Sequence, residues 1–330
     1  MDRYRVNTCL LSQFLYNGEK FLPQFFDSLI AQKLENWELI VVNDGSKDKS
    51  EDIIKSYADK FVHLKVLYQE NQGVSVARNT GMAEATGKYI TFPDIDDEIS
   101  PQMYGRLLEI ALSNDLDVAT CNGTYVYTNG DAPKAIFPPN KVPSTGVISG
   151  PEWLEIGLSS RKFLHVTWLN LYRLDMLRQH KFFFEPKLHH QDIPWTTEVL
   201  LVAKRVQFIN EQYYRYLIHN QSVSHSLSGD ERSVRKIKTY LKIIDMLLNI
   251  YQRYPEQVKQ APACLWQVGK EGLGVIQALL AIKSPDVQKE MVQLFFDKGY
   301  WQIVWAHATT VKLKWRLIRR YTKLKEIIKS

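Results

Sequence analysis

The chain has 330 residues, of which 45% are hydrophobic and 24% charged, and this composition excludes a fully disordered or fibrous protein. Its length exceeds what one compact core usually organises, so a large domain with a smaller appendage is expected. The net charge of the chain is +6, but residues 311–330 alone carry +7, so the first 310 residues carry −1. Because the positive charge is confined to this one segment, nucleic acid is not the expected partner.

Helical and strand patterns alternate through the first 130 residues. Helical spacing of apolar side chains predicts helices over residues 21–32, 51–61, 74–86 and 102–112. Short apolar or alternating runs predict strands over residues 37–42, 64–68, 88–92 and 116–128. Pro23 fits the first turn of its helix, whereas Ser100 and Pro101 are expected to be the N-cap and first residue of theirs.

This alternation predicts an α/β fold with a mostly parallel, doubly wound, Rossmann-like sheet. Ligands bind such sheets beyond the carboxyl ends of the strands. Three polar clusters are expected there: Tyr16-Asn17, Asn43-Asp44 and Asp94 to Asp97.

The second half of the chain becomes helical. Residues 128–146 read as a long loop, a helix with Pro151 near its start follows, and the pattern is helical from about residue 230. The predicted domains are therefore residues 1–228, with halves 1–128 and 129–228, and a helical C-terminal extension, residues 229–330.

The basic segment 311–330 has helical spacing of Leu313, Leu317, Tyr321, Leu324 and Ile328. Two interpretations stay open: a solvated helix docked by this apolar stripe, or an interfacial helix that contacts an anionic membrane. No signal peptide or spanning segment is recognised, and three scattered cysteines indicate a reduced compartment. The expected location is cytoplasmic, peripheral on the inner membrane if the segment binds lipid.

The carboxylates of Asp94, Asp96 and Asp97 follow a predicted strand and would repel one another without a cation. Mn²⁺ or Mg²⁺ prefers such oxygen ligands and bridges them to substrate phosphates, although a solvated acidic turn would have the same composition. Asp44 could accept hydrogen bonds from a bound nucleotide or simply form a turn. Arg78 could meet a phosphate or lie on the surface of a helix.

The segment "LHHQDIPWTTE" places His189, His190 and Asp192 within four positions. Such a group could hold a metal, supply a general base or form an ordinary polar turn. The metal is better assigned to Asp94 and Asp96, and the residues alone leave open whether this segment supplies a base or forms a polar turn. His189 and His190 could orient the acceptor, supply a third metal ligand or pack; His219 and His225 are weaker candidate ligands.

Three segments resemble the family 2 nucleotide-sugar glycosyltransferases in order and spacing: "LYNGEKFLPQFFDSLIAQ", "WELIVVNDGSKDKS" and "NQGVSVARNTGMAEATGKYITFPDIDDE". The resemblance implies a GT-A fold, a UDP-sugar donor and an inverting reaction. It also implies that Tyr16 and Asn17 lie at the nucleotide site, that Asp44 contacts uracil, that Arg78 contacts the nucleotide and that Asp94 and Asp96 hold the cation. Ser12, Gln13 and Phe14 depart from the family's usual apolar-apolar-Pro, and Gln191-Asp192 replaces its Glu-Asp.

Residues 144–225 resemble more narrowly the bacterial lipopolysaccharide core glucuronosyltransferases that modify an inner-core heptose. This implies UDP-glucuronate as donor and a lipopolysaccharide core heptose as acceptor, with Asp192 in the position of the base. Arg161 and Lys162 are the candidate partners of the glucuronate carboxylate, since Arg matches a carboxylate geometrically. Asp97 is a further candidate near the transferred or accepting sugar.

Three alternatives remain. The donor could be UDP-glucose or UDP-galactose on the same fold, in surface-glycan synthesis. The chain could be a catalytically silent subunit that binds nucleotide-sugar or glycan. A dinucleotide-dependent oxidoreductase is disfavoured, because no G-x-G-x-x-G follows the first strand.

Overall fold

The computed structural model describes residues 8–32, 34–127, 130–218 and 229–329, with only the backbone of residues 8–14. The chain divides between residues 219 and 220 into two compact units. The predicted domain limits at 128 and 228, and both His219 and His225, lie outside the described residues.

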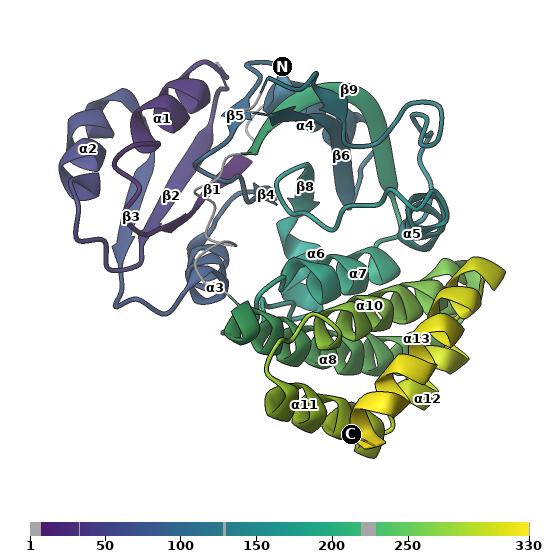
Figure 1. Ribbon diagram of the computed structural model, residues 1–330. Helices are drawn as coiled ribbons and strands as arrows, with labels where there is room; N and C mark the ends of the chain where they lie inside the picture. The colour runs from purple at the N-terminus through teal and green to yellow at the C-terminus, as the bar shows by residue number, and fades with distance from the viewer. Residues whose placement is uncertain (1–7, 33, 128–129, 219–228, 330) are drawn as a thin grey trace. The chain divides into compact units, whose positions relative to one another are not determined.

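A single mixed sheet organises the first unit (Figure 1). Its path runs β3-β2-β1-β4-β8-β6-β9-β5, with β7 paired to β6. The strands are β1 (Thr8–Leu15), β2 (Trp37–Asn43), β3 (Leu64–Tyr68), β4 (Tyr89–Thr91), β5 (Glu98–Ile99), β6 (Val118–Tyr127), β7 (Lys134–Ala135), β8 (Asn170–Arg173) and β9 (Val206–Ile218). Strands β1 to β4 pair in parallel, which confirms the α/β prediction, whereas β8, β5 and β7 pair antiparallel to their neighbours.

The sequence predicts the first five α-helices of this unit but not the last two. The helices are α1 (Leu22–Ile30), α2 (Ser50–Tyr57), α3 (Val74–Glu84), α4 (Met103–Ser113), α5 (Gly150–Ser159), α6 (Leu174–Gln179) and α7 (Asp192–Val202). Pro23 lies in the first turn of α1, as predicted. The predicted cap of α4 is wrong: the helix begins at Met103 after Gln102, and the Ser100 hydroxyl donates to Oε1 of Gln102.

An aromatic cluster packs in the core at the end of β4. Trp195 of α7 stacks on Phe184, with ring centroids 4.3 Å apart, and meets Phe92 and Tyr172 edge-on. Phe92 follows β4 and precedes Asp94 by two residues, so this packing brings the N-terminal part of α7 to the end of β4. Burying rings of this size contributes several kcal/mol per side chain, about 3–5 by large-to-small substitution.

Strand β1 contains an irregularity where the sequence departs from the family pattern. The pairing with β2 shifts between Ser12 and Phe14, so Gln13 occupies a bulge. A bulge inserts one residue and increases local twist. The backbone thereby accommodates this segment while Leu15 still pairs with Asn43.

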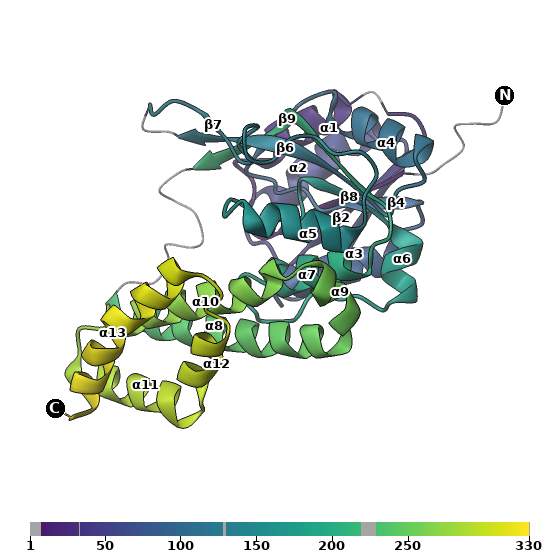
Figure 2. The same ribbon diagram turned by 90° about the vertical axis from the view of Figure 1, so that its right-hand side faces the viewer.

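The second unit is entirely helical in its described part. Its helices are α8 (Gly229–Arg253), α9 (Pro255–Gln260), α10 (Ala263–Leu279), α11 (Pro285–Asp297), α12 (Tyr300–Ala306) and α13 (Val311–Lys329) (Figure 2). The buried side chains of α13 are Leu313, Leu317 and Leu324, and the helix packs against α10 and α11. None of the described helices combines the length and hydropathy needed to span a bilayer.

Candidate functional site

The end of β4 carries an acidic turn that meets a buried arginine. Arg78 of α3 is almost fully buried, and its Nη2 lies 3.2 Å from Asp94 Oδ1. The guanidinium also stands 5.4 Å above the ring of Phe184. A charged pair in these surroundings is costly to break, so Arg78 and Asp94 hold each other in place.

Three carboxylates gather at this point. Burial, together with the negative charges of Asp96 and Asp192, raises the pKa of Asp94 to about 7 against the opposing effect of Arg78. The structure therefore brings Asp94 and Asp96 close to Asp192, 96 positions after Asp96 in the sequence. Crowded carboxylates of this kind are typical of cation sites and of acid–base chemistry.

Asp97 belongs to the same turn but is engaged internally. Its carboxylate accepts hydrogen bonds from the Tyr214 hydroxyl (2.8 Å) and the Leu217 N–H (2.9 Å). The Tyr214 oxygen in turn accepts from the Asp94 N–H (3.1 Å). The side chain of Asp97 thus ties β9 to the acidic turn, and burial with the charges of Asp94 and Asp96 raises its pKa.

Asp192 is the first residue of α7, and it is half-buried. A helix N-terminus favours a negative charge. Behind it, the Thr196 hydroxyl donates to the Asp192 carbonyl (2.7 Å), and His165 Nδ1 lies 2.9 Å from the same hydroxyl. These contacts fix the first turn of α7.

The two histidines lie beside this turn. Their rings are 4.2 Å apart; His189 is half-buried, and His190 is exposed with a left-handed φ of 58°. Among the residues that the structure describes, no group of three or more His, Cys, Asp or Glu side chains is arranged to hold a metal ion. A cation on Asp94 and Asp96 would therefore need ligands from substrate or water, as Mg²⁺ usually has.

At the end of β2, Asp44 holds a neighbouring loop. The fully buried carboxylate accepts hydrogen bonds from Gln69 Nε2 (2.6 Å), Gln72 N–H (2.9 Å) and Gly73 N–H (2.8 Å). Gly73 has a φ of 87°, a left-handed conformation that glycine adopts without a steric cost. Asp44 thus shapes the loop that enters α3, and its contact with a base stays a prediction.

Tyr16 and Asn17 follow β1 at the same edge of the sheet. The ring of Tyr16 is 41% exposed. Asn17 ties its loop to the next turn, since its side-chain oxygen accepts from the Lys47 N–H (2.9 Å) and its own N–H donates to Ser46 Oγ (3.1 Å). Both residues are exposed, and the side chain of Asn17 is used within its own loop.

Arg161 and Lys162 follow α5 and are both exposed. Arg161 Nη1 donates to the Leu158 carbonyl (3.3 Å) at the end of its own helix. This contact places the Arg161 side chain at the C-terminal end of α5, and a contact of this pair with a sugar stays a prediction.

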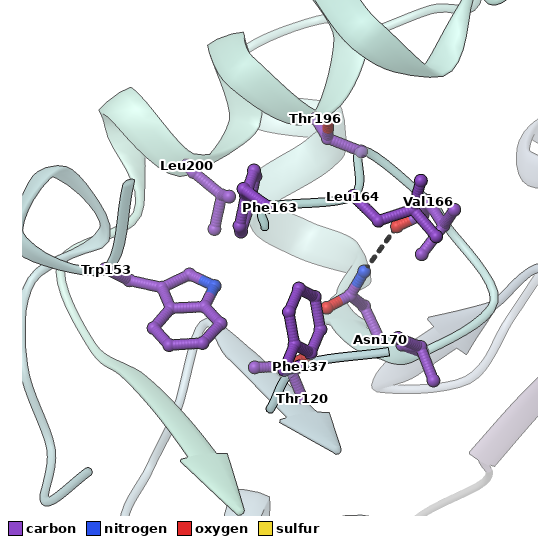
Figure 3. A pocket seen from close by; sticks show the side chains of 10 residues that line it. Thr120, Phe137, Trp153, Phe163, Leu164, Val166, Asn170, Thr196 and Leu200 are labelled. Carbon is purple, nitrogen blue, oxygen red and sulfur yellow. Dashed lines mark hydrogen bonds between the residues drawn. The ribbon is translucent and has the colours of Figure 1, made fainter. Parts of the chain in front are cut away.

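A small pocket lies behind α7 (Figure 3). It leaves only about 10 Å³ for the centre of a water molecule, which is room for one water and not for a sugar. Its walls are Thr120, Phe137, Trp153, Phe163, Leu164, Val166, Leu169, Asn170, Thr196 and Leu200. The pocket is therefore part of the packing that supports α7.

Sequence reasoning missed Gln69, His165 and Tyr214, which contact the candidate residues. Gln69 lies in a loop next to the predicted strand 64–68, so strand-end reasoning could have included it. Tyr214 is 117 positions from its partner Asp97 and His165 is 31 from Thr196, so no local pattern identifies them.

The sequence is similar to a known protein family and to individual glycosyltransferases. Residues 14–143 match the family model described as glycosyl transferase family 2. The "uncharacterized glycosyltransferase YibD" of Escherichia coli (strain K12) is 37% identical over 306 residues, which cover 92% of this chain and 88% of that protein. The cholesterol galactosyltransferase of Borreliella burgdorferi is 27% identical over 271 residues, covering 77% and 73% of the two chains.

Solved structures share the fold. TarS of S. aureus (residues 1–349) in complex with UDP aligns with a TM-score of 0.61 and 18% identity, over 97% of this chain and 90% of that one. A mannosyltransferase of Pyrobaculum calidifontis in complex with GDP-Man and Mn²⁺ aligns with a TM-score of 0.54 and 13% identity, over 98% and 88%. The predicted GT-A fold is confirmed, and with the sequence relatives it establishes that this chain belongs to glycosyl transferase family 2.

Proposed function

We propose that this glycosyltransferase moves a sugar from a UDP-sugar to a saccharide hydroxyl, with inversion at the anomeric carbon. The convergence of Asp94, Asp96 and Asp192 beside Arg78 carries the proposal. TarS, which shares the fold over most of this chain, was solved with UDP and with UDP-GlcNAc, and this supports a UDP-linked donor.

Asp94 and Asp96 would hold Mn²⁺ or Mg²⁺. Burial, with a smaller contribution from the charge of Asp96, raises the pKa of Asp94, and a divalent cation would favour the ionised carboxylates. The hard oxygen donors suit either ion. The mannosyltransferase with the same fold was solved with Mn²⁺. When bound, such an ion neutralises charge on the leaving diphosphate.

Asp192 is the proposed base. Its carboxylate takes the proton from the attacking hydroxyl while Arg78 keeps Asp94 oriented toward the donor side. The bonds from Thr196 and His165 keep the first turn of α7 rigid, so the base stays at a fixed distance from the acidic turn. Tyr16 and the loop held by Asp44 would receive the nucleotide.

The proposed donor sugar is glucuronic acid, and the proposed acceptor is a lipopolysaccharide inner-core heptose. The resemblance of residues 144–225 supports both. A panel of UDP-glucuronate, UDP-glucose, UDP-galactose and UDP-GlcNAc against truncated core oligosaccharides, with Mn²⁺, Mg²⁺ or EDTA, tests this by mass spectrometry. We expect the mass of one glucuronate to be added to a heptose, and this addition to be lost with EDTA. Addition of a hexose would instead identify UDP-glucose or UDP-galactose as the donor. The absence of both a mass gain and UDP release with every donor would support a silent subunit.

Arg161 is the proposed partner of the glucuronate carboxylate, with Lys162 beside it. Arg161 is exposed, and its Nη1 donates a hydrogen bond to the Leu158 carbonyl of α5. Arg161→Ala is expected to raise the KM for UDP-glucuronate about tenfold or more, since an ion pair with a carboxylate is lost. Equal losses with UDP-glucose in the same assay would remove the carboxylate role.

A contact between α13 and an anionic membrane is part of the proposal, with a location at the cytoplasmic face of the inner membrane. Leu313, Leu317 and Leu324 of the predicted stripe are buried inside the second unit, which agrees with the docked interpretation for these positions. Tyr321 and Ile328 of the same stripe are not fully buried. A second stripe remains outside: Val311, Trp315 and Ile318 are 87%, 55% and 55% exposed.

Basic residues run beside this second stripe. Each residue of the stripe is followed directly by a cation, and the row continues one turn further; its members are Lys312, Arg316, Arg319 and Lys323. These cations therefore occupy the adjacent face of the same helix. The Arg319 guanidinium lies 4.6 Å from the centre of the Trp315 ring. Exposed Trp and Ile beside a row of cations fit the interface of an anionic bilayer.

A further inference from the structure

A row of aromatic rings leads away from the acidic turn. It consists of Tyr214, Trp168, Tyr216, Tyr125 and Tyr127, and we call it the aromatic row. Trp168 stacks on Tyr214 at 4.2 Å and on Tyr216 at 5.5 Å between ring centroids. Tyr216 meets Tyr125 at 6.0 Å, and Tyr125 meets Tyr127 at 6.5 Å.

The pairing of β6 with β9 explains why these rings share one face. Tyr125 is opposite Tyr216 in the parallel register, and residues two apart on a strand point to the same side. The two strands run side by side near β7 (Figure 2).

One end of the aromatic row is anchored in the proposed active site. The Tyr214 hydroxyl donates to Asp97 and accepts from the Asp94 N–H, as described above. Burial, followed by the charges of Asp97, Asp94 and Asp96, raises the pKa of Tyr216 to about 12, which reflects how near that ring lies to the acidic turn.

Burial falls along the aromatic row. Tyr214 and Trp168 are buried, whereas Tyr216, Tyr125 and Tyr127 are half-buried and keep part of their surface toward solvent. Sugar rings present C–H bonds on their faces, and aromatic side chains that line a binding site pack against such apolar faces. The half-buried rings therefore offer a stacking surface for a saccharide.

The order of the strands indicates which saccharide. The polar clusters proposed for the nucleotide follow β1 and β2, on one side of β4, whereas the aromatic row lies on β6 and β9, on the other side. The acidic turn at the end of β4 stands between them. A ligand on the aromatic row would thus reach the carboxylates from the side opposite the nucleotide.

We infer that Tyr216 and Tyr125 form the acceptor-saccharide subsite, where a sugar ring stacks next to the one that is glycosylated. This inference rests on the proposed transferase site, since it assigns the second substrate of that site. Neither tyrosine was identified from the sequence, and the stacking role needs the ring and not the hydroxyl.

Four variants test the subsite: Tyr216→Ala, Tyr125→Ala, Tyr216→Phe and the control Tyr213→Ala. Tyr213 is half-buried on the same strand, and the charges around it are those of Glu211 and Arg106 and not those of the acidic turn. Calorimetry with a heptose-containing core oligosaccharide, in saturating UDP, measures acceptor binding. Calorimetry with UDP alone measures the nucleotide site, and thermal unfolding identifies any variant that fails to fold.

The expected result is a loss of oligosaccharide affinity of about tenfold or more in each Tyr→Ala variant, as for a buried aromatic contact. Tyr216→Phe and Tyr213→Ala should bind like the natural chain, and UDP affinity should not change. The inference would be overturned if both folded Ala variants bound the oligosaccharide as tightly as the natural chain, or if the natural chain did not bind it. An equal loss of oligosaccharide affinity in Tyr213→Ala would also overturn it.

The outcome is separate from that of the proposed function. Tyrosine-dependent oligosaccharide binding without transfer from any UDP-sugar would retain the subsite and reject the reaction. Transfer with an unchanged acceptor KM in both Ala variants would retain the reaction and reject the subsite.

Discussion

Asp192 and Asp94 are both partly buried carboxylates, yet their neighbours differ. Asp94 faces Arg78, while Asp192 begins a helix whose first turn is held by Thr196. A cationic partner and a helix N-terminus favour charge in different ways, through an ion pair and through oriented N–H groups. This difference supports separate roles, with Asp94 as cation ligand and Asp192 as base.

Asp192→Asn removes the base without changing the size of the side chain. Transfer is expected to fall by about 10²–10⁴-fold, the usual contribution of a positioned base, while UDP affinity stays within about twofold. Steady-state transfer assays and calorimetry with UDP measure the two effects. The control is Asp175→Asn, which changes an exposed aspartate in the first turn of α6. Transfer near the natural rate in Asp192→Asn would contradict the assignment.

Two other candidate residues, Asp44 and Asp97, hold the local backbone in place. The carboxylates of Asp44 and Asp97 accept hydrogen bonds from backbone N–H groups that would otherwise lose their partners. An unmade buried hydrogen bond costs about 1–3 kcal/mol. Substituting either residue is therefore expected to disturb the site indirectly, so loss of activity alone would not demonstrate substrate contact.

At the scale of elements, the junction of β6 and β9 decides where the aromatic row lies. The register shifts on both sides of Asn122, so that Cys121 pairs with Ile209 but Gly123 pairs with Tyr214. The fully buried Asn122 side chain fills the interrupted ladder. It accepts from the N–H groups of Gly123 and Phe137 and donates to the Phe137 carbonyl and to Asn210.

Asn122→Ala would leave both backbone groups of Phe137 without these partners. The free energy of unfolding is expected to fall by about 3 kcal/mol, because unsatisfied buried groups carry their full desolvation cost. Urea denaturation followed by fluorescence measures the change. Asn140→Ala, at an exposed asparagine of the same connecting segment, should leave the midpoint in place; an equal shift in both variants would reject the role of Asn122.

At the scale of the whole molecule, charge is the property that separates α13 from the rest of the chain. Residues 311–330 carry +7 against −1 for all preceding residues. Each Lys or Arg near an anionic bilayer adds about 1 kcal/mol of attraction, which salt screens within a Debye length. Attraction of this kind would strengthen the proposed contact of α13 with an anionic membrane.

Replacing Lys312, Arg316, Arg319 and Lys323 by Gln is expected to weaken binding to phosphatidylglycerol-containing vesicles by at least about 100-fold at low salt. Trp315→Ser with Ile318→Ser should weaken it in a salt-independent way. Vesicle sedimentation measures both. The charge-matched control replaces the exposed Arg235, Lys238, Lys289 and Lys298 by Gln; equal loss in the control would mean that net charge, and not this face, binds the membrane.

The sequence by itself determined the parallel half of the sheet, its helices and the position of the acidic turn. Strand-end motifs such as Asn43-Asp44 and Asp94 to Asp97 follow from local turn chemistry and from side-chain periodicity, both of which a short segment encodes. Local signals did not identify α7, whose first residue is Asp192. They erred at Ser100, which lies outside α4.

Only the tertiary structure decided which groups meet. The gathering of Asp192 with Asp94, the bonds of Asp97 to Tyr214 and Leu217, and the aromatic row depend on strand pairing and register between segments about 90–120 positions apart. A one-residue change of register would turn Tyr214 and Tyr216 to the opposite face while leaving the sequence pattern intact. Side-chain contacts of that range are set by packing of the whole sheet, so no single stretch of the chain encodes them.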